Sequence, residues 1–194
     1  QPNVTLVDSK ADPIERITET GIRTRDASYD FDMIIYATGF DALRGAFDRI
    51  DIRGHGGKAL KDQWKNGATS LVGMLQDGFP NMFMLLGPHT ALGNIPRSIE
   101  FNVEWVSALL QYMQDHGKTF AEARPEAREK WMEHVMDVAK GLLSMEVDSW
   151  MTGVNINVAG KQTRIVARYT GTAPTYRAWA EAVADNGYKD LVLQ

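Results

Sequence analysis

Cysteine is absent from the 194-residue sequence. Its absence excludes disulfide frameworks, CxxC redox motifs, thiolate zinc sites and cysteine nucleophiles. It also favours a reducing compartment, so the expected location is the cytoplasm. Long apolar runs are missing as well, because the longest, residues 33–37 and 82–86, fall far short of the roughly 20 residues of a membrane-spanning helix. We therefore expect no membrane span.

An excess of positive charge is also lacking. Lys and Arg total 21 against 25 for Asp and Glu, a formal net charge of -4, so no nucleic-acid partner is expected. The four histidines, at positions 55, 89, 116 and 134, have no ligand-like spacing, and no metal site is expected. The motifs GxSxG, HExxH, GxGxxG and the Walker loop do not occur, so the sequence carries none of these catalytic or phosphate-binding signatures.

Strand-like segments dominate the first forty residues. The first lies at residues 4–8, directly after Gln1, Pro2 and Asn3 and with no initiating methionine, which predicts a piece of a longer polypeptide. Others follow at residues 14–18, 22–24 and 33–37. Residues 33–37 and 82–86 are apolar on both alternating faces, which is typical of strands buried in the sheet of an α/β protein. The predicted fold class is therefore α/β.

Helical patterns dominate the second half. Asn94 and Pro96 mark the start of a helix with apolar stripes that extend to Met113. A second helix begins near Pro125, and a shorter one covers residues 174–184, before a final strand-like segment at residues 191–193. The expected inner face of the second helix comprises Ala127, Trp131, Val135, Val138, Leu142 and Met145.

Two segments predict a ligand site. Ala37, Thr38 and Gly39 follow an apolar strand, where ligands of open α/β sheets bind, and residues 87–96 join a strand to the N-terminus of a helix. Both segments also have an ordinary structural interpretation, as the end of a strand and as a connection from a strand to a helix. His89 is a candidate general base, although a single loop histidine is usually solvated, and Trp150 is suited either to contact with a ligand ring or to core packing.

Residues 32–42 (DMIIYATGFDA) resemble the "ATG" strand of flavin-dependent monooxygenases. Residues 78–88 (GFPNMFMLLGP), 94–100 (NIPRSIE), 103–106 (VEWV) and 149–156 (SWMTGVNI) follow in the order found in Baeyer–Villiger monooxygenases, and the chain resembles their carboxyl-terminal portion. The resemblance implies an α/β flavoprotein with two Rossmann-like dinucleotide-binding domains, for FAD and NADP. Residues 1–41 would complete the NADP domain and hinge, 42–100 would return to the FAD domain with a pocket loop, and 101–194 would form a helical region that closes the active site.

The resemblance further implies an enzyme that uses FAD, NADPH and O2 to insert one oxygen atom beside a ketone carbonyl, which gives an ester or lactone. The residues implied in cofactor binding are Ala37, Thr38, Gly39, Phe40, Asp41, Asn94, Ile95 and Trp150. Those implied in substrate binding are His89, Thr90, Ala91, Leu92 and Gly93.

No catalytic residue is expected in this chain. The family's glycine-rich fingerprints, its FxGxxxHxxxW signature and its catalytic arginine belong upstream of residue 1, so the upstream half of the same enzyme is the expected partner and the chain alone should be inactive. Two alternatives remain open. One is an N- or S-oxygenating flavin monooxygenase, and the other is a noncatalytic binding or assembly module.

Overall fold

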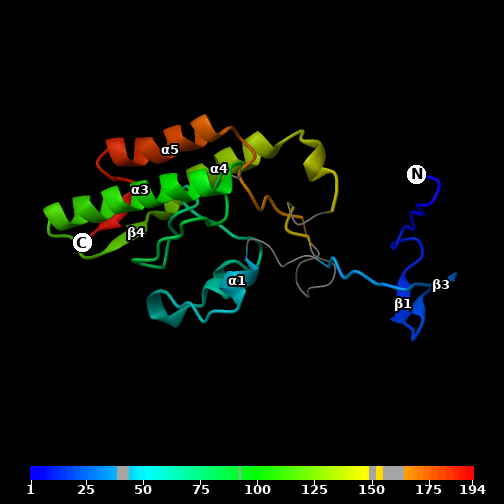
Figure 1. The fold of residues 1–194 in the computed structure, drawn as a ribbon. Coiled ribbons are helices and arrows are strands. Elements are labelled where there is room, and N and C mark those ends of the chain that lie inside the picture. The colour runs from blue at the N-terminus through cyan, green and yellow to red at the C-terminus, as the bar shows by residue number, and fades with distance from the viewer. Residues whose placement is uncertain (39–43, 92, 149–151, 155–163) are drawn as a thin grey trace. The chain divides into compact units, whose positions relative to one another are not determined.

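The structure is a computed structural model that describes residues 1–38, 44–91, 93–148, 152–154 and 164–194. The chain divides into two compact units, Gln1–Gly39 and Phe40–Gln194, which are drawn in Figure 1 and are described separately below. The domain assignment for residues 1–41, 42–100 and 101–194 stays a prediction.

The first unit is a three-stranded antiparallel sheet in the order β1, β2, β3. The strands are β1 (Ile14–Ile17), β2 (Gly21–Thr24) and β3 (Ser28–Asp30). The strands predicted at residues 14–18 and 22–24 are thus confirmed. Residues 4–8 form no strand and are exposed, so the prediction of a strand there was wrong.

The buried strand predicted at residues 33–37 is also wrong. These residues form no strand, and the side chains of Met33 and Ile35 are 76% and 81% exposed. A strand exists only by pairing with a neighbour, and no described segment of the chain pairs with this one. Its apolar pattern therefore marks surface that the described residues leave uncovered.

The second unit has a small core around Trp64, whose indole is fully buried. Two short helices, α1 (Gly45–Asp48) and α2 (Leu60–Gln63), contribute Phe47 and Leu60 to it, and an exposed 3₁₀ turn, His55–Gly57, lies between them in the sequence. Residues 82–86 were predicted as a buried strand, but their backbone is irregular. Met84 belongs to this core, and Met82 packs against it. Asn81 has a φ of 57°, which breaks the extended conformation just before the run, and Met84 N donates to Met74 O at 2.9 Å.

The larger core lies among three long helices, α3 (Ile95–Asp115), α4 (Pro125–Ala139) and α5 (Ala173–Asp185). Each begins with a proline in its first turn, as the sequence predicts. Figure 1 shows α3 and α5 running alongside one another, and the indole Nε1 of Trp105 on α3 donates to Ala180 O on α5 at 2.7 Å. Trp131 of α4 is fully buried against Tyr169, Tyr176 and Trp179.

The predicted length of α4 needs one correction. The helix ends at Ala139, because Lys140 is extended and Gly141 has a φ of 75°, so Leu142 and Met145 lie beyond it rather than on its inner face. A 3₁₀ turn, Leu143–Met145, follows. A two-stranded antiparallel sheet pairs β4 (Ala121–Ala123) with β5 (Leu191–Leu193), and β4 was not predicted.

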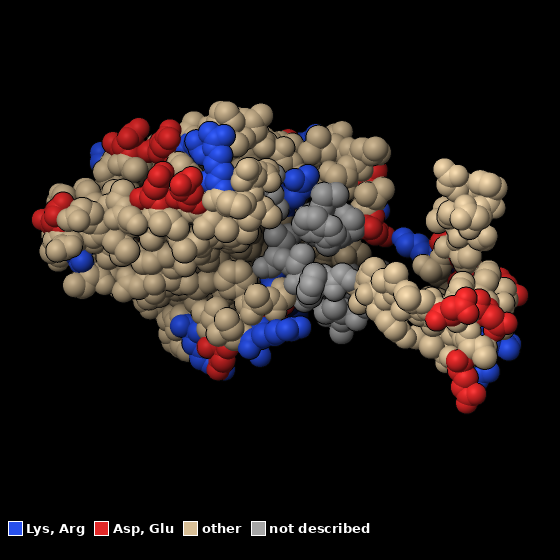
Figure 2. All heavy atoms as spheres, viewed as in Figure 1, with Lys and Arg blue, Asp and Glu red and all other residues tan. Residues whose placement is uncertain are grey.

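The described helices include none that is both long and apolar enough to cross a bilayer. On the face of the second unit that is visible in Figure 2, acidic and basic side chains are interspersed.

Candidate functional site

The start of α3 leaves one backbone donor free. The side chain of Asn94 accepts a hydrogen bond from Arg97 N at 3.2 Å, and Ser98 N donates to Asn94 O at 3.0 Å. Pro96 has no N–H, so among the described residues the Ile95 N–H is the donor of this turn that has no partner. Because the side chains of Asn94 and Ile95 are exposed, a ligand carbonyl could reach this N–H from solvent.

His89 lies in the loop before α3 and is fully buried, so the expectation of a solvated side chain was wrong. Its Nε2 lies 2.8 Å from Val166 O, which can only accept, so the proton is assigned to Nε2. Nδ1 lies 3.2 Å from the hydroxyl of Ser70. Burial lowers the pKa of His89 from its ordinary value of 6.5 to about 4, partly offset by the bond to Val166, so the imidazole is neutral at pH 7.

The next two loop residues also face the protein interior. Thr90 and Ala91 are buried, and the carbonyl of Ala91 accepts a bond from the hydroxyl of Ser98 at 2.8 Å. Ala91 also forms an isolated parallel bridge with Tyr169. The loop is therefore fixed to α3 and to the segment that precedes α5.

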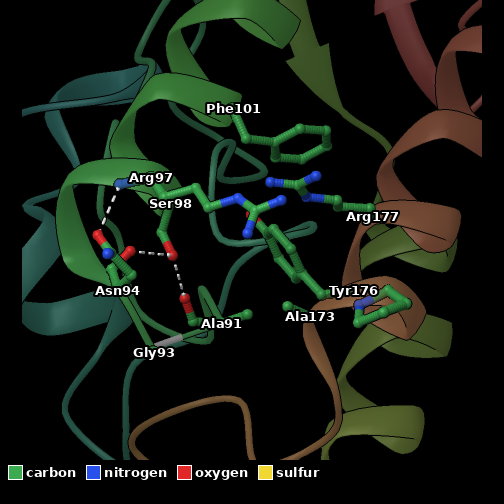
Figure 3. A pocket seen from close by; sticks show the side chains of 10 residues that line it. Ala91, Gly93, Asn94, Arg97, Ser98, Phe101, Ala173, Tyr176 and Arg177 are labelled. Carbon is green, nitrogen blue, oxygen red and sulfur yellow. Dashed lines mark hydrogen bonds between the residues drawn. The ribbon is translucent and has the colours of Figure 1, made fainter.

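A cavity of about 240 Å³ opens where the first turns of α3 and α5 face each other. Figure 3 shows its walls: Phe101 and Tyr176 lie on two sides, and Arg97 and Arg177 point toward one another between them. The Arg177 guanidinium lies 5.0 Å from the centre of the Phe101 ring, within the range of a cation–π contact. The buried phenol of Tyr176 donates to Val72 O at 2.8 Å, and burial raises its pKa above the usual range.

Comparisons with known proteins find relatives of the chain. No protein-family model matches the chain. A Baeyer–Villiger monooxygenase of Pseudooceanicola batsensis is 39% identical over 191 residues, which cover 98% of this chain and 34% of that protein. The crystal structure of OTEMO in complex with FAD and NADP superposes with a TM-score of 0.88 at 39% identity, and the match covers 100% of this chain and 35% of that one. Over nearly its whole length the chain is similar to a portion of the Baeyer–Villiger monooxygenases.

The chain spans about a third of the length of the curated relatives that it matches. Another relative, phenazine N-monooxygenase PhzNO1 of Lysobacter antibioticus, is 37% identical over 193 residues, which cover 99% of this chain and 35% of that protein. The solved relative also confirms the α/β flavoprotein fold to which these helices and strands belong.

This similarity leaves the individual site residues as predictions. Ala91, Gly93 and Asn94 line the cavity, Ile95 begins α3, and His89 and Thr90 lie in the buried interior behind it. Ala37 and Thr38 are exposed residues of the first unit. Five predicted residues lie outside the described part of the chain: Gly39, Phe40, Asp41, Leu92 and Trp150.

Sequence reasoning missed the two arginines of the cavity. One signal was present for Arg97, because a cation in the first turn of a helix opposes the positive end of the helix dipole. Arg177 lies in the second turn of α5, where this signal is weaker. Nothing local to either residue indicates that the two would meet, since that depends on how α3 packs against α5.

Proposed function

We propose that the complete protein that carries these residues is an FAD- and NADPH-dependent Baeyer–Villiger monooxygenase. It would convert a ketone, O2, NADPH and a proton into an ester or lactone, NADP+ and water. The observation that supports this most directly is 39% identity over 98% of the chain to a Baeyer–Villiger monooxygenase. These residues would supply about a third of the enzyme, with the remainder as their partner.

The residues present fit a flavin at one point. The unpaired N–H of Ile95, at the positive end of α3, is a suitable donor to a carbonyl oxygen of the flavin ring. Bound FAD supplies the redox chemistry with O2, and NADPH supplies the electrons. The chain's own contribution would be to position the flavin edge at Asn94 and Ile95, and to exclude water with the packed loop and the N-terminal turns of α3 and α5.

Product analysis with the complete protein tests this proposal. The protein is loaded with FAD, supplied with NADPH and ¹⁸O2, and offered cyclic and linear ketones. We expect an ester or lactone that carries one labelled oxygen atom. NADPH oxidation that yields only hydrogen peroxide with every ketone would contradict the proposal. Cell fractionation tests the cytoplasmic location, which is part of the same proposal.

A second candidate function is oxygenation at nitrogen. It is favoured by the 37% identity over 99% of the chain to phenazine N-monooxygenase. The same assay distinguishes the two functions when the ketone is replaced by an aromatic N-heterocycle such as phenazine. An N-oxide formed from the heterocycle, with no ester formed from any ketone, would replace the leading proposal.

A further inference from the structure

The two arginines of the cavity have an unusual environment. Arg97 of α3 and Arg177 of α5 point toward one another across the opening (Figure 3). Among the described residues, neither guanidinium forms an ion pair or donates a side-chain hydrogen bond, and the one contact of Arg177 is with the face of Phe101. Each guanidinium therefore has all five N–H donors available.

Like charges that face one another repel, and an anion between them relieves the repulsion. Arg97 extends from the first turn of α3, where the helix dipole adds positive potential, and Arg177 extends from the second turn of α5. Phe101 holds Arg177 against the cavity wall rather than in bulk solvent. The rest of the lining combines small and apolar residues with neutral polar ones, Asn94, Ser98 and Tyr176, and contains no carboxylate. An oxyanion is the ligand that relieves this arrangement, because carboxylates and phosphates match the planar fork of donors on arginine.

The size of the cavity and its position indicate what carries that oxyanion. A volume of about 240 Å³ accommodates a group of several heavy atoms rather than a whole dinucleotide. Ala91 and Gly93, which are predicted to contact substrate, form part of the same wall as the arginines. We propose that Arg97 and Arg177 bind an oxyanion of the substrate, so that the substrate class is ketones that bear a carboxylate or phosphate group. This inference rests on the proposed function.

Matched substrates test the inference in the complete, FAD-loaded protein. We expect 4-oxocyclohexanecarboxylate to have a lower KM than its neutral methyl ester. Arg97→Met and Arg177→Met keep the length of the side chain but remove the charge, and each should lower the preference for the acid about tenfold, as is typical for the loss of a charge-assisted hydrogen bond. Arg97→Lys should restore part of the preference, because it restores the charge without the fork.

Lys130→Met is the control. Lys130 is an exposed cation on α4 that does not line the cavity, so its replacement changes the net charge equally and should not alter the preference. If the preference falls equally in this variant, or if it persists in both arginine variants, the inference is wrong. Should Arg177→Met fail to fold because Phe101 loses its cover, the exposed Arg97 decides the question alone.

Calorimetry with unreactive probes separates the inference from the proposed function. Cyclohexanecarboxylate should bind the wild-type protein about tenfold more tightly than cyclohexanecarboxamide, and the difference should disappear in the arginine variants. If cyclohexanecarboxylate binds in this way but no ketone is turned over, the proposed function is contradicted and the oxyanion site is supported. If the acid and the ester are both turned over with equal KM, the proposed function is supported and the oxyanion site is contradicted. Inorganic phosphate that binds the arginines while neither carboxylate does would identify a site for a free anion and contradict a substrate-borne group.

Discussion

His89 and Val166, which are 77 residues apart in the sequence, are joined by a 2.8 Å hydrogen bond from imidazole Nε2 to the backbone carbonyl oxygen. His89 has a φ of 67°, a left-handed conformation that is rare for residues with a side chain. The bond holds the loop before α3 against the segment that leads into α5. A neutral imidazole thus adds to the contacts of Ala91 that connect the same two segments.

We predict that acid weakens this connection. The pKa of His89 is lowered by burial to about 4 in the folded protein against an ordinary value of 6.5, so the unfolded state binds more protons between these values. The contribution of neutral His89 is fully present above about pH 6.5 and is lost as the pH falls to about 4. A shift of this size corresponds to about 3 kcal/mol in the free energy of unfolding. Thermal denaturation between pH 7 and pH 4 measures it.

His89→Gln keeps a donor near Val166 but cannot titrate. The variant should be less stable at pH 7 and should lose stability less steeply toward pH 4. His134→Gln is the comparison, because the pKa of His134 is also lowered by burial, although this side chain is only partly buried. A slope that is the same in wild-type and His89→Gln proteins would show that other groups cause the acid response.

Trp131 should be the most sensitive position of the larger core. Its side chain is fully buried among Tyr169, Tyr176 and Trp179, so Trp131→Ala should cost about 3–5 kcal/mol in the free energy of unfolding. Its indole N–H has no hydrogen-bond partner in the described structure. Trp131→Phe removes this unpaired donor and should cost less than half as much. Urea denaturation compares the two variants. Equal losses in the free energy of unfolding would contradict the prediction that most of the cost of Trp131→Ala comes from lost packing.

Gly73 should tolerate no side chain. It has a φ of 70°, and a Cβ there would lie 2.9 Å from the backbone nitrogen of Thr90 and closer still to the Thr90 hydroxyl. Gly56 has a similar φ of 62° with nothing within 4 Å of the added atom. Gly56→Ala should therefore cost only the conformational penalty of about 1–2 kcal/mol, and Gly73→Ala should cost more. Melting temperatures that fall equally would show that the Thr90 contact relaxes easily.

Ile95→Pro tests the proposed flavin donor. Proline suits the first residue of a helix, so the fold should persist while the free N–H disappears. We expect FAD to bind about three- to tenfold more weakly, as for the loss of one neutral hydrogen bond, with a shifted flavin absorption spectrum. Ile95→Ala keeps the N–H and controls for the side chain. A spectrum and affinity that are unchanged in the proline variant would place the flavin elsewhere.

Trp150→Ala tests the predicted contact with NADP. The indole N–H is a hydrogen-bond donor, so its removal should weaken retention of NADP+ and should increase the fraction of O2 released as hydrogen peroxide. Fluorescence titration with NADP+ and a peroxide assay provide the two measurements. If the affinity for NADP+ and the fraction of O2 released as hydrogen peroxide are both unchanged, Trp150 has a structural role only.

Local signals predicted the helices well. Asn94 and the prolines at positions 96, 125 and 174 act within one turn of their own position, so the starts of α3, α4 and α5 can be read from a few residues. The strands predicted from the apolar runs at residues 33–37 and 82–86 were wrong, because strand formation needs a partner that the run itself does not specify.

The candidate site was predictable only in part. The loop before α3 was located from its glycines and from the helix that follows it. The burial of His89 was missed because it is created by Ser70 and Val166, which no local pattern connects to it. The pairing of Arg97 with Arg177 was missed for the same reason, since two helices distant in the sequence must pack before the charges meet.

The antiparallel pairing of β4 with β5 has a consequence for biosynthesis. Ala121 pairs with Leu193, which is synthesised 72 residues later, so β4 cannot form its ladder until then. Helices α3 and α4 need only local hydrogen bonds to form. During translation the helices should therefore emerge from the ribosome with their apolar stripes uncovered. Until Leu191–Leu193 is released, β4 lacks this partner and its edge is open to association with other chains.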